Sequence, residues 1–347
     1  MYRRKLFLLI SILGIVFGIF FVFKFYQTFF WSNTQFENDF SYVFVDRDDT
    51  IDSLTLQMKP LLKSTKNFLI AAEKKGYAQR IRSGKYRIQK SMGNNDIINT
   101  LRSQRLTTKV VFNNQERIED LVGRVAEQIE ADSLSLLKSF LDPAFLEEAG
   151  FTEDNALAMY LPNTYEVFWD TTPENFRNRM LTYYQSYWNE NRKNKVKSLG
   201  LTPVEAVILA SIVQKESVQV EEQNTIAGVY LNRLKKKMKL QADPTVIYAM
   251  KKVTGDFQQV IKRVLYKDLK LNSPYNTYKI KGLPPGPITM PDLRTLEAVL
   301  HPEQHDYLYF VAAPEKIGYH LFASSLAEHN RNKKKYTRWL NNQKIYR

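Results

Sequence analysis

The first thirty residues restrict this chain more than any other stretch, because Leu6 to Phe23 contains no charged residue. A helix of about 18 residues, rising 1.5 Å per residue, nearly spans the hydrocarbon core of a bilayer. Three cations precede this run, and an aromatic cluster suited to the membrane interface follows it. These features predict a transmembrane helix over residues 6–24, with residues 1–5 as a cytoplasmic tail and the remainder on the outer side.

A cleaved signal peptide is the alternative interpretation of this segment. It would show a shorter apolar region and a cleavage site made of small residues, and neither is visible. We therefore expect a single-pass anchor in the cell (inner or cytoplasmic) membrane, with the main part of the chain on the outer, periplasmic side. The net charge of +14 is typical of nucleic-acid binding. An exported domain does not meet DNA, so anionic cell-wall polymer or lipid headgroups fit this charge better.

The rest of the chain divides by pattern into a short linker and two domains. After a linker over residues 25–40, whose polar part, Ser32 to Asp39, predicts a stalk, strand, helix, helix and strand patterns follow one another. These predict a small βααβ module over residues 41–106. From residue 107 onward, strand and helix patterns mix, which predicts a larger α+β domain over residues 107–347. Within it we expect one helical stretch over residues 133–151 and one long aromatic helix from Pro173 to near Gly200.

The segment "LTPVEAVILASIVQKES" begins as a helix should and then becomes entirely apolar. Thr202 and Glu205 form a capping box, with Pro203 at the first helical position. From Val204 to Val213 the helix is apolar on every face, which predicts that it is buried. A buried helix that ends on a lysine and a glutamate needs a further explanation.

Glu216 lies four residues after Ile212, so it continues a buried stripe of this helix. Burial disfavours the charged carboxylate and raises its pKa. A carboxylic acid that is protonated at neutral pH is what a general acid needs. The alternative is that the helix reaches the surface at Gln214 and that Glu216 is a solvated end residue.

Two later segments supply polar and aromatic groups for a binding cleft. "QADPTVIYAM" predicts a helix with Asp243 as N-cap and Pro244 at the first helical position. "NSPYNTYKIKGLPPGPITMP" predicts a long loop stiffened by prolines. Aromatic faces, amides and hydroxyls of this kind commonly hold sugar rings, and long loops of this composition are seldom mere connectors.

Six ordered motifs resemble one known family. They are "LASIVQKES", "VYLNRL", "LQADPTVIYAM", "YNTYKIKGLPPGPI", "YLYFVAA" and "HLFASSLAEHN". From Thr107 to about Tyr336 the chain resembles the MltG (YceG-like) endolytic murein transglycosylases. The resemblance implies a single N-terminal anchor, a LysM-like module over residues 41–106 and a YceG-like catalytic domain. The implied reaction cleaves MurNAc–GlcNAc bonds in nascent peptidoglycan strands and leaves 1,6-anhydroMurNAc ends, which would terminate strand elongation.

By this resemblance the family's catalytic glutamate falls on Glu216. A second glutamate, common two positions earlier in the family, is Gln214 here. The remaining candidates for substrate binding are Gln241, Asp243, Tyr275, Asn276, Thr277 and Tyr278, with His320 and Asn330 as weaker ones. The implied partners are peptidoglycan glycan strands, the membrane and peptidoglycan synthases.

Two other functions remain open from the residues alone. One is a glycan hydrolase that pairs Glu216 with Asp243 or Glu221 as its second carboxylate. The other is a wall-binding scaffold without activity. We expect no metal and no cofactor, because the chain has no cysteine and Pro302 disrupts the helix on which His301 and His305 would share a zinc ion.

Overall fold

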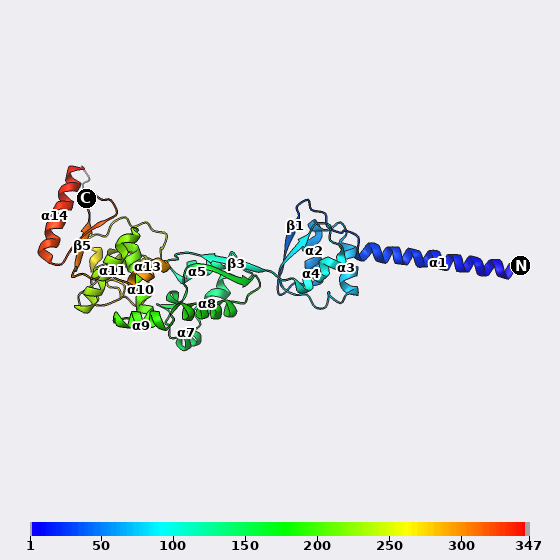
Figure 1. Cartoon of the computed structure of the whole chain (residues 1–347), viewed down its shortest axis with the longest axis horizontal. Coiled ribbons are helices and arrows are strands. Elements are labelled where there is room, and N and C mark those ends of the chain that lie inside the picture. Colours follow the sequence, from blue (N-terminus) through cyan, green and yellow to red (C-terminus); the bar gives the residue numbers. More distant parts are fainter. Residues whose placement is uncertain (1, 344–347) are drawn as a thin grey trace. The chain divides into compact units, whose positions relative to one another are not determined.

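The computed structural model describes residues 2–343. Met1, part of the expected cytoplasmic tail, and residues 344–347, the end of the expected catalytic domain, lie outside the described residues. The chain separates into two compact units. The smaller one holds Met1–Val110, Gln128–Ala131 and Tyr165–Thr172, and the larger one holds Val111–Glu127, Asp132–Thr164 and Pro173–Arg347. Both contain helices and strands, so the chain is mixed α+β, as expected (Figure 1).

The N-terminal run forms one continuous helix, α1 (Tyr2–Phe29). The helix has 28 residues, and an 18-residue stretch within it has a mean hydropathy of 3.0. This length and composition are sufficient to cross a membrane, and none of that stretch is buried within the protein. An exposed helix of this composition is stable where lipid replaces water around it. The helix is therefore consistent with membrane anchoring.

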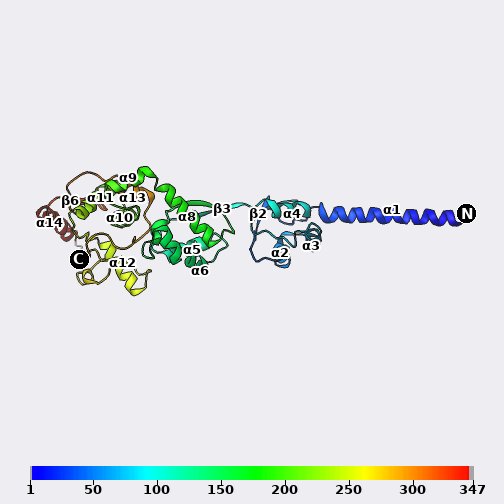
Figure 2. The ribbon, with the colours of Figure 1, turned by 90° about the horizontal axis from the view of Figure 1, so that it is seen from below.

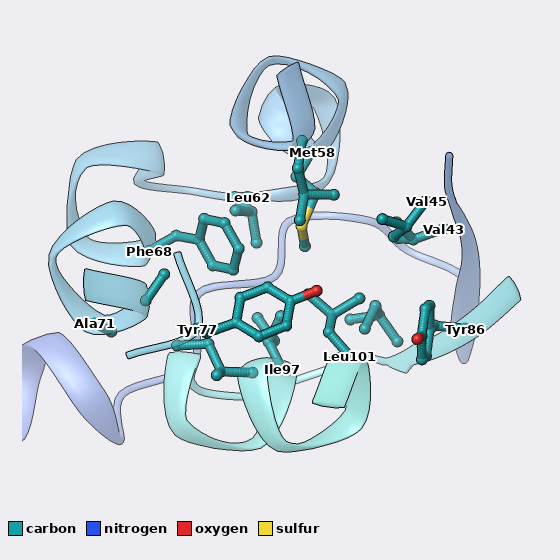
Figure 3. Packing of buried hydrophobic residues seen from close by; sticks show 14 of the residues in the cluster. Val43, Val45, Met58, Leu62, Phe68, Ala71, Tyr77, Tyr86, Ile97 and Leu101 are labelled. Atoms are coloured by element: carbon teal, nitrogen blue, oxygen red, sulfur yellow. The ribbon is translucent and has the colours of Figure 1, made fainter. Parts of the chain in front are cut away.

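The smaller unit has the strand, helix, helix, strand order predicted from its sequence (Figure 1). Its elements after α1 are β1 (Phe40–Val45), α2 (Ile51–Met58), the short 3₁₀ helix η1 (Lys59–Leu61), α3 (Thr65–Lys74), β2 (Gly84–Gln89) and α4 (Asn94–Ser103). β1 and β2 pair antiparallel, with Phe40 opposite Gln89 and Val45 opposite Gly84. Alternate residues of the strands and one face of each helix meet in a single apolar cluster around Phe68, Tyr77 and Ile97 (Figure 3).

Part of the expected linker, residues 25–40, packs into this unit. Phe29 is buried in the apolar cluster. Asn33 is buried as well, and its side-chain amide donates to Ser64 O at 2.9 Å and to Asn94 Oδ1 at 2.7 Å. The polar composition of residues 32–39 predicted a stalk, whereas in the structure a buried asparagine with satisfied donors holds this segment against the smaller unit.

Strand β3 (Thr107–Phe112) pairs with β4 (Asn163–Phe168), and most residues of both strands belong to the smaller unit. The larger unit is mainly helical and contains a small antiparallel sheet, in which β5 (Tyr309–Ala312) pairs with β6 (His320–Ala323). The helices are α5 (Ile118–Ala126), α6 (Ser133–Phe140), α7 (Pro143–Ala149), η2 (Ala156–Met159), α8 (Pro173–Tyr187), α9 (Glu190–Ser198), α10 (Pro203–Glu216), α11 (Val220–Lys235), α12 (Asp243–Thr254), η3 (Asp268–Lys270), α13 (Leu293–Leu300) and α14 (Leu326–Asn342).

Two segments expected as single helices are each divided in two. The stretch over residues 133–151 breaks before Pro143, where the side chain of Asp142 accepts a hydrogen bond from Ala144 N at 3.1 Å. The long aromatic helix breaks before α9, which Asn189 caps by accepting from Arg192 N at 3.0 Å. In both cases a capping side chain starts a new helix within a stretch that was expected to be continuous.

Helix α10 is the centre of the larger unit, with α11, α12 and α13 packed around it (Figure 2). Every residue from Ala206 to Val213 is buried. This confirms the prediction made from its all-apolar sequence. The buried helix therefore holds its last residue, Glu216, at a fixed position.

Candidate active site

The ends of α10 determine where Glu216 lies. At the start, Thr202 Oγ1 accepts from Glu205 N at 3.2 Å, and the Glu205 side chain accepts from Thr202 N at 2.8 Å. This is the predicted capping box, with Pro203 at the first position. At the other end, Ser217 leaves the helix in an extended conformation. Glu216 is thus the last helical residue, at the edge of the buried core.

Glu216 is only partly exposed, and its carboxyl group contacts Tyr230 of α11. The Tyr230 hydroxyl donates to Glu216 Oε1 at 2.7 Å. Burial, as the largest effect, raises the pKa of Glu216 to about 7, and the charge of Asp243 also acts to raise it. The Tyr230 hydrogen bond and the positive charge of Arg233 act to lower it. Near neutral pH a large fraction of Glu216 is therefore protonated, as a general acid requires.

Glu216 opens onto a cavity of about 350 Å³. The cavity lies between the ends of α10 and α12, the strand β5 and the helix α14. The residues that line it are Glu216, Tyr230, Arg233, Leu240, Gln241, Asp243, Tyr278, Tyr309, Phe310, Leu326, His329, Asn330 and Lys333. Aromatic faces, carboxylates, amides and cations in one concave space are suited to a polar ring that carries hydroxyls.

The second carboxylate of the cavity belongs to Asp243, the first residue of α12. The Tyr278 hydroxyl donates to Asp243 Oδ1 at 2.6 Å. Asp243 was expected to be the N-cap of this helix, but Ala242 is the N-cap and no side chain caps it. Gln241 before it adopts a left-handed backbone conformation with φ of +51°. The Asp243 side chain therefore does not cap α12 and instead accepts the hydrogen bond from Tyr278.

Arg233 of α11 is the buried cation of the cavity. Its Nε donates to Leu308 O at 2.6 Å and its Nη1 to Leu240 O at 2.7 Å. These bonds join α11 to the segments before α12 and β5. The guanidinium is therefore held by backbone carbonyls, so it affects Glu216 by its charge at a fixed position.

Four of the eight expected substrate-binding residues line this cavity: Gln241, Asp243, Tyr278 and Asn330. The other four do not. Asn276 and Thr277 are fully buried, and Tyr275 almost so. His320 on β6 donates its backbone N–H to Glu222 Oε1 at 3.0 Å, and its Nδ1 lies 3.0 Å from Glu222 Oε2.

The buried loop residues hold the cavity wall in place. Thr277 Oγ1 accepts from Ala242 N at 2.9 Å and lies 2.8 Å from Thr245 Oγ1. Asn276 donates to Leu271 O at 2.7 Å and accepts from Tyr278 N at 3.0 Å. These bonds tie the loop to the start of α12 and fix the backbone of Tyr278. Tyr275, Asn276 and Thr277 are buried in a row, and only Tyr278 of "YNTY" reaches the cavity, an arrangement that no periodic pattern in the sequence predicts.

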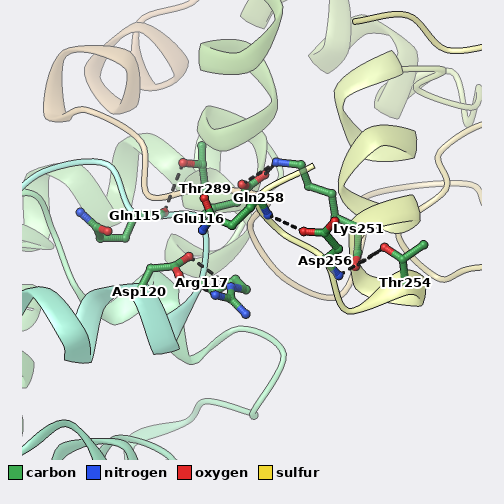
Figure 4. Close-up of polar contacts among 9 residues, drawn as sticks. All are labelled: Gln115, Glu116, Arg117, Asp120, Lys251, Thr254, Asp256, Gln258 and Thr289. Atoms are coloured by element: carbon green, nitrogen blue, oxygen red, sulfur yellow. Dashed lines mark hydrogen bonds and ion pairs between the residues drawn. The ribbon is translucent and has the colours of Figure 1, made fainter. Parts of the chain in front are cut away.

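A polar cluster at the other end of α12 fixes that helix against the start of α5 (Figure 4). Lys251 pairs with Glu116 at 2.9 Å, and both side chains are largely buried. Beside them, Arg117 pairs with Asp120 at 2.6 Å, and Thr289 Oγ1 donates to Gln115 O. The helix that carries Asp243 is therefore attached at both ends.

Comparison with known proteins places this arrangement in a family. The model of the YceG-like family matches residues 43–335. The chain belongs to the YceG-like family. It is 33% identical to an endolytic murein transglycosylase of Bacillus subtilis (strain 168) over 302 residues, which are 81% of this chain and 80% of that relative.

Two further relatives agree with this placement. An endolytic murein transglycosylase of Streptococcus pneumoniae serotype 2 is 28% identical over 80% of this chain, and the match spans about half, 54%, of that longer relative. A crystal structure of a yceG-like protein from Listeria monocytogenes superposes with a TM-score of 0.54. It is 27% identical and covers 85% of this chain and 99% of that one.

In this YceG-like protein, Gln214 does not line the cavity of Glu216. Its side-chain oxygen accepts from Asp292 N at the start of α13. Two positions along a helix rotate a side chain by about 200°, so positions 214 and 216 face opposite sides. Gln214 is therefore a connection between helices α10 and α13.

Several cavity residues were missed by sequence reasoning: Tyr230, Arg233, Tyr309, Phe310, His329 and Lys333. Tyr230 and Arg233 lie within the motif "VYLNRL" at helical spacing, which was a usable signal. The other four come from β5 and α14, far from Glu216 in the sequence. Only the folded chain brings them to α10.

Proposed function

We propose that this chain is a membrane-anchored endolytic peptidoglycan transglycosylase and that Glu216 is its catalytic acid and base. The observation that carries the proposal is a carboxyl group with a pKa of about 7 inside a polar, aromatic cavity. Membership of the YceG-like family and the names of the relatives support the same reaction. The reaction class is that of a lyase, because no water is consumed.

In the first half of the reaction, protonated Glu216 donates its proton to the oxygen that links MurNAc to GlcNAc. The glycosidic bond then breaks with positive charge developing on the muramoyl ring. The ring hydroxyls are contacted by the polar groups of Gln241, Asn330 and Asp243. Aromatic faces of Tyr309 and Phe310 cover the sugar and exclude water.

In the second half, the Glu216 carboxylate accepts the proton of the muramoyl 6-hydroxyl while that oxygen bonds to the anomeric carbon. This closes the 1,6-anhydro ring and returns Glu216 to its protonated state. A nucleophile on the same sugar has a high effective concentration, so a second catalytic carboxylate is unnecessary. General acid–base help of this kind contributes about 10²–10⁴-fold to the rate.

A two-carboxylate hydrolase is the competing function, and Asp243 is the specific reason to test for it. Asp243 shares the cavity with Glu216, whereas Glu221, the other expected partner, does not line it. In a hydrolase, a water activated by Asp243 would attack the anomeric carbon and leave a reducing end. The hydrogen bond from Tyr278 holds the Asp243 carboxylate in place, which fits a role in binding substrate as well as a role as the second catalytic carboxylate.

The test is digestion of purified glycan strands by the full-length chain and by Glu216→Gln. We expect 1,6-anhydro ends, one water lighter than hydrolytic ends in mass spectrometry. The variant should lose at least about 100-fold in kcat, because it cannot donate or accept the proton. Reducing ends would instead indicate hydrolysis, and intact strands that still bind the protein would indicate a scaffold.

Thermal unfolding provides the control for this variant. Since burial of the Glu216 carboxylate opposes its ionisation, glutamine at this position removes a destabilising charge above pH 7. At about pH 8 the variant should unfold at the same temperature as the unchanged protein or a higher one. Full activity in a folded Glu216→Gln protein would contradict the role of Glu216.

For the remaining parts we propose the architecture that the resemblance implied. Residues 41–106 form a LysM-like module, supported by the β1, α2, α3, β2 order and the antiparallel pairing of its strands. Residues 107–347 form the catalytic domain. The cations at residues 3–5 keep the N-terminus in the cytoplasm, so the catalytic domain lies on the outer side, beside peptidoglycan synthases.

A further inference from the structure

A second cavity adjoins the candidate active site, and Glu216 and Asp243 line both. Its volume is about 440 Å³. The lining residues are Lys215, Glu216, Asp243, Pro244, Ile247, Lys262, Arg263 and Val264. The two carboxylates therefore stand at the junction of two concave spaces. An enzyme that cuts inside a strand needs such an arrangement, because the strand continues on both sides of the broken bond.

The second cavity has three cationic side chains in addition to the two carboxyl groups that it shares with the first. Lys215, Lys262 and Arg263 are exposed, and in the described part of the chain none of them has an ion pair or a hydrogen bond through its side chain. Other cations of the same unit have partners within the protein: Lys251 pairs with Glu116, and Arg233 donates to backbone carbonyls. Three cationic side chains without a protein partner line one cavity, and such side chains can bind an anionic group.

These cations are not explained by the chemistry at Glu216. The groups that shift the pKa of Glu216, apart from its burial, are Tyr230, Asp243 and Arg233. Within residues 2–343 none of the three cations forms an ion pair with a carboxylate, so these side chains are not needed to hold the fold together. Their positions on the last turn of α10 and on the segment between α12 and η3 face the hollow next to the bond that would be cut.

We propose that Lys215, Lys262 and Arg263 form a subsite for the stem-peptide carboxylates of a muramoyl residue beside the cut bond. This rests on the proposed function and adds a preference for strands that still carry their peptides. A bare muramoyl residue has one lactyl carboxylate, whereas a stem peptide brings several. Three unpaired cations in a single cavity match the more highly charged ligand.

The experiment compares two preparations of the same glycan strands, one with intact stem peptides and one stripped of them by an amidase. The readout is kcat/KM for formation of 1,6-anhydro ends. We expect the full-length chain to have a higher kcat/KM on peptide-bearing strands than on stripped strands. In the double variant Lys262→Gln, Arg263→Gln the ratio of these two kcat/KM values should be about three- to tenfold smaller. The loss should appear in KM, with kcat unchanged, and should shrink at high ionic strength.

Matched variants separate recognition of charge from structural damage. Lys195→Gln, Lys197→Gln removes two exposed cations of α9 that line neither cavity, so its preference should equal that of the unchanged chain. The exchange Lys262→Arg, Arg263→Lys keeps the charges and should keep the preference. Equal rates on both strand preparations with the unchanged chain would overturn the subsite, as would a preference that survives in the glutamine variant. Absence of anhydro ends on any strand would instead reject the proposed function.

Discussion

At the scale of single residues, the chemistry depends on opposing influences on one carboxyl group. Burial and the charge of Asp243 raise the pKa of Glu216, while Tyr230 and Arg233 lower it, and the result is about 7. An unfolded chain releases this proton near pH 4.5. The contribution of Glu216 to the free energy of unfolding therefore decreases as pH rises from about 4.5 to about 7. The burial that keeps Glu216 protonated near neutral pH therefore lowers the free energy of unfolding above pH 4.5.

The variant Tyr230→Phe tests this balance. It removes the hydroxyl that donates to Glu216 Oε1 and favours the ionised carboxylate. The pKa of Glu216 should rise, so the limb of the pH profile on which activity falls with rising pH should move upward by about one unit. The measurement is kcat/KM for anhydro-end formation as a function of pH.

Tyr309→Phe is the matched control, since Tyr309 lines the same cavity and has no hydrogen bond to Glu216. Its pH profile should coincide with that of the unchanged chain. A downward shift in the Tyr230 variant would mean that the hydrogen bond stabilises the protonated form of Glu216, contrary to our account.

At the scale of elements, α10 and α12 supply the two carboxylates, and a proline-rich loop holds the start of α12. The loop residue Thr277 contacts Ala242 and Thr245, so its hydroxyl fixes the turn before Asp243. The position of Asp243 in the cavity thus depends on a buried hydrogen bond between two segments that are far apart in the sequence.

Replacing Thr277 by valine keeps the shape of the side chain and leaves the buried Ala242 N–H without its acceptor. We expect a loss of about 1–3 kcal/mol in the free energy of unfolding, measured by urea denaturation. Thr254→Val, at the exposed end of the same helix, should change it by about 0.5 kcal/mol or less. If the Thr277 variant were as stable as the unchanged chain but had a higher KM, the residue would be a substrate contact, as its sequence first suggested.

At the scale of the whole molecule, the chain has two compact units, and the apolar helix α1 is part of the smaller one. Helix α1 continues from its lipid-suited part into the smaller unit, where Phe29 is buried and Thr28 O accepts from Asn94 Nδ2 at 2.7 Å. An anchor joined to a folded unit in this way has no flexible chain between the apolar helix and the β1–β2 module.

Deletion of residues 2–24 should release the protein from membranes while leaving Phe29 in place. The full-length chain should remain in the membrane fraction after a high-salt wash and dissolve in detergent, because apolar burial holds it there. The shortened chain should be soluble and retain activity on purified strands. Protease added outside intact spheroplasts should digest the large unit of the full-length chain, and protection from it would reverse the proposed orientation.

The sequence by itself determined the local features: the apolar helix α1, the βααβ order of the small unit, the capped and buried helix α10, and the position of Glu216 at its end. These follow from periodicity, capping and composition, which act over a few residues. Tertiary structure decided the rest. Tyr278 lines the cavity whereas Tyr275 is buried, and Asp243 is the first residue of the helix that it was expected to cap. Strand β5 and helix α14 also reach the cavity only in the folded chain. Contacts between such distant segments leave no periodic pattern in the sequence, so the sequence alone could not predict them.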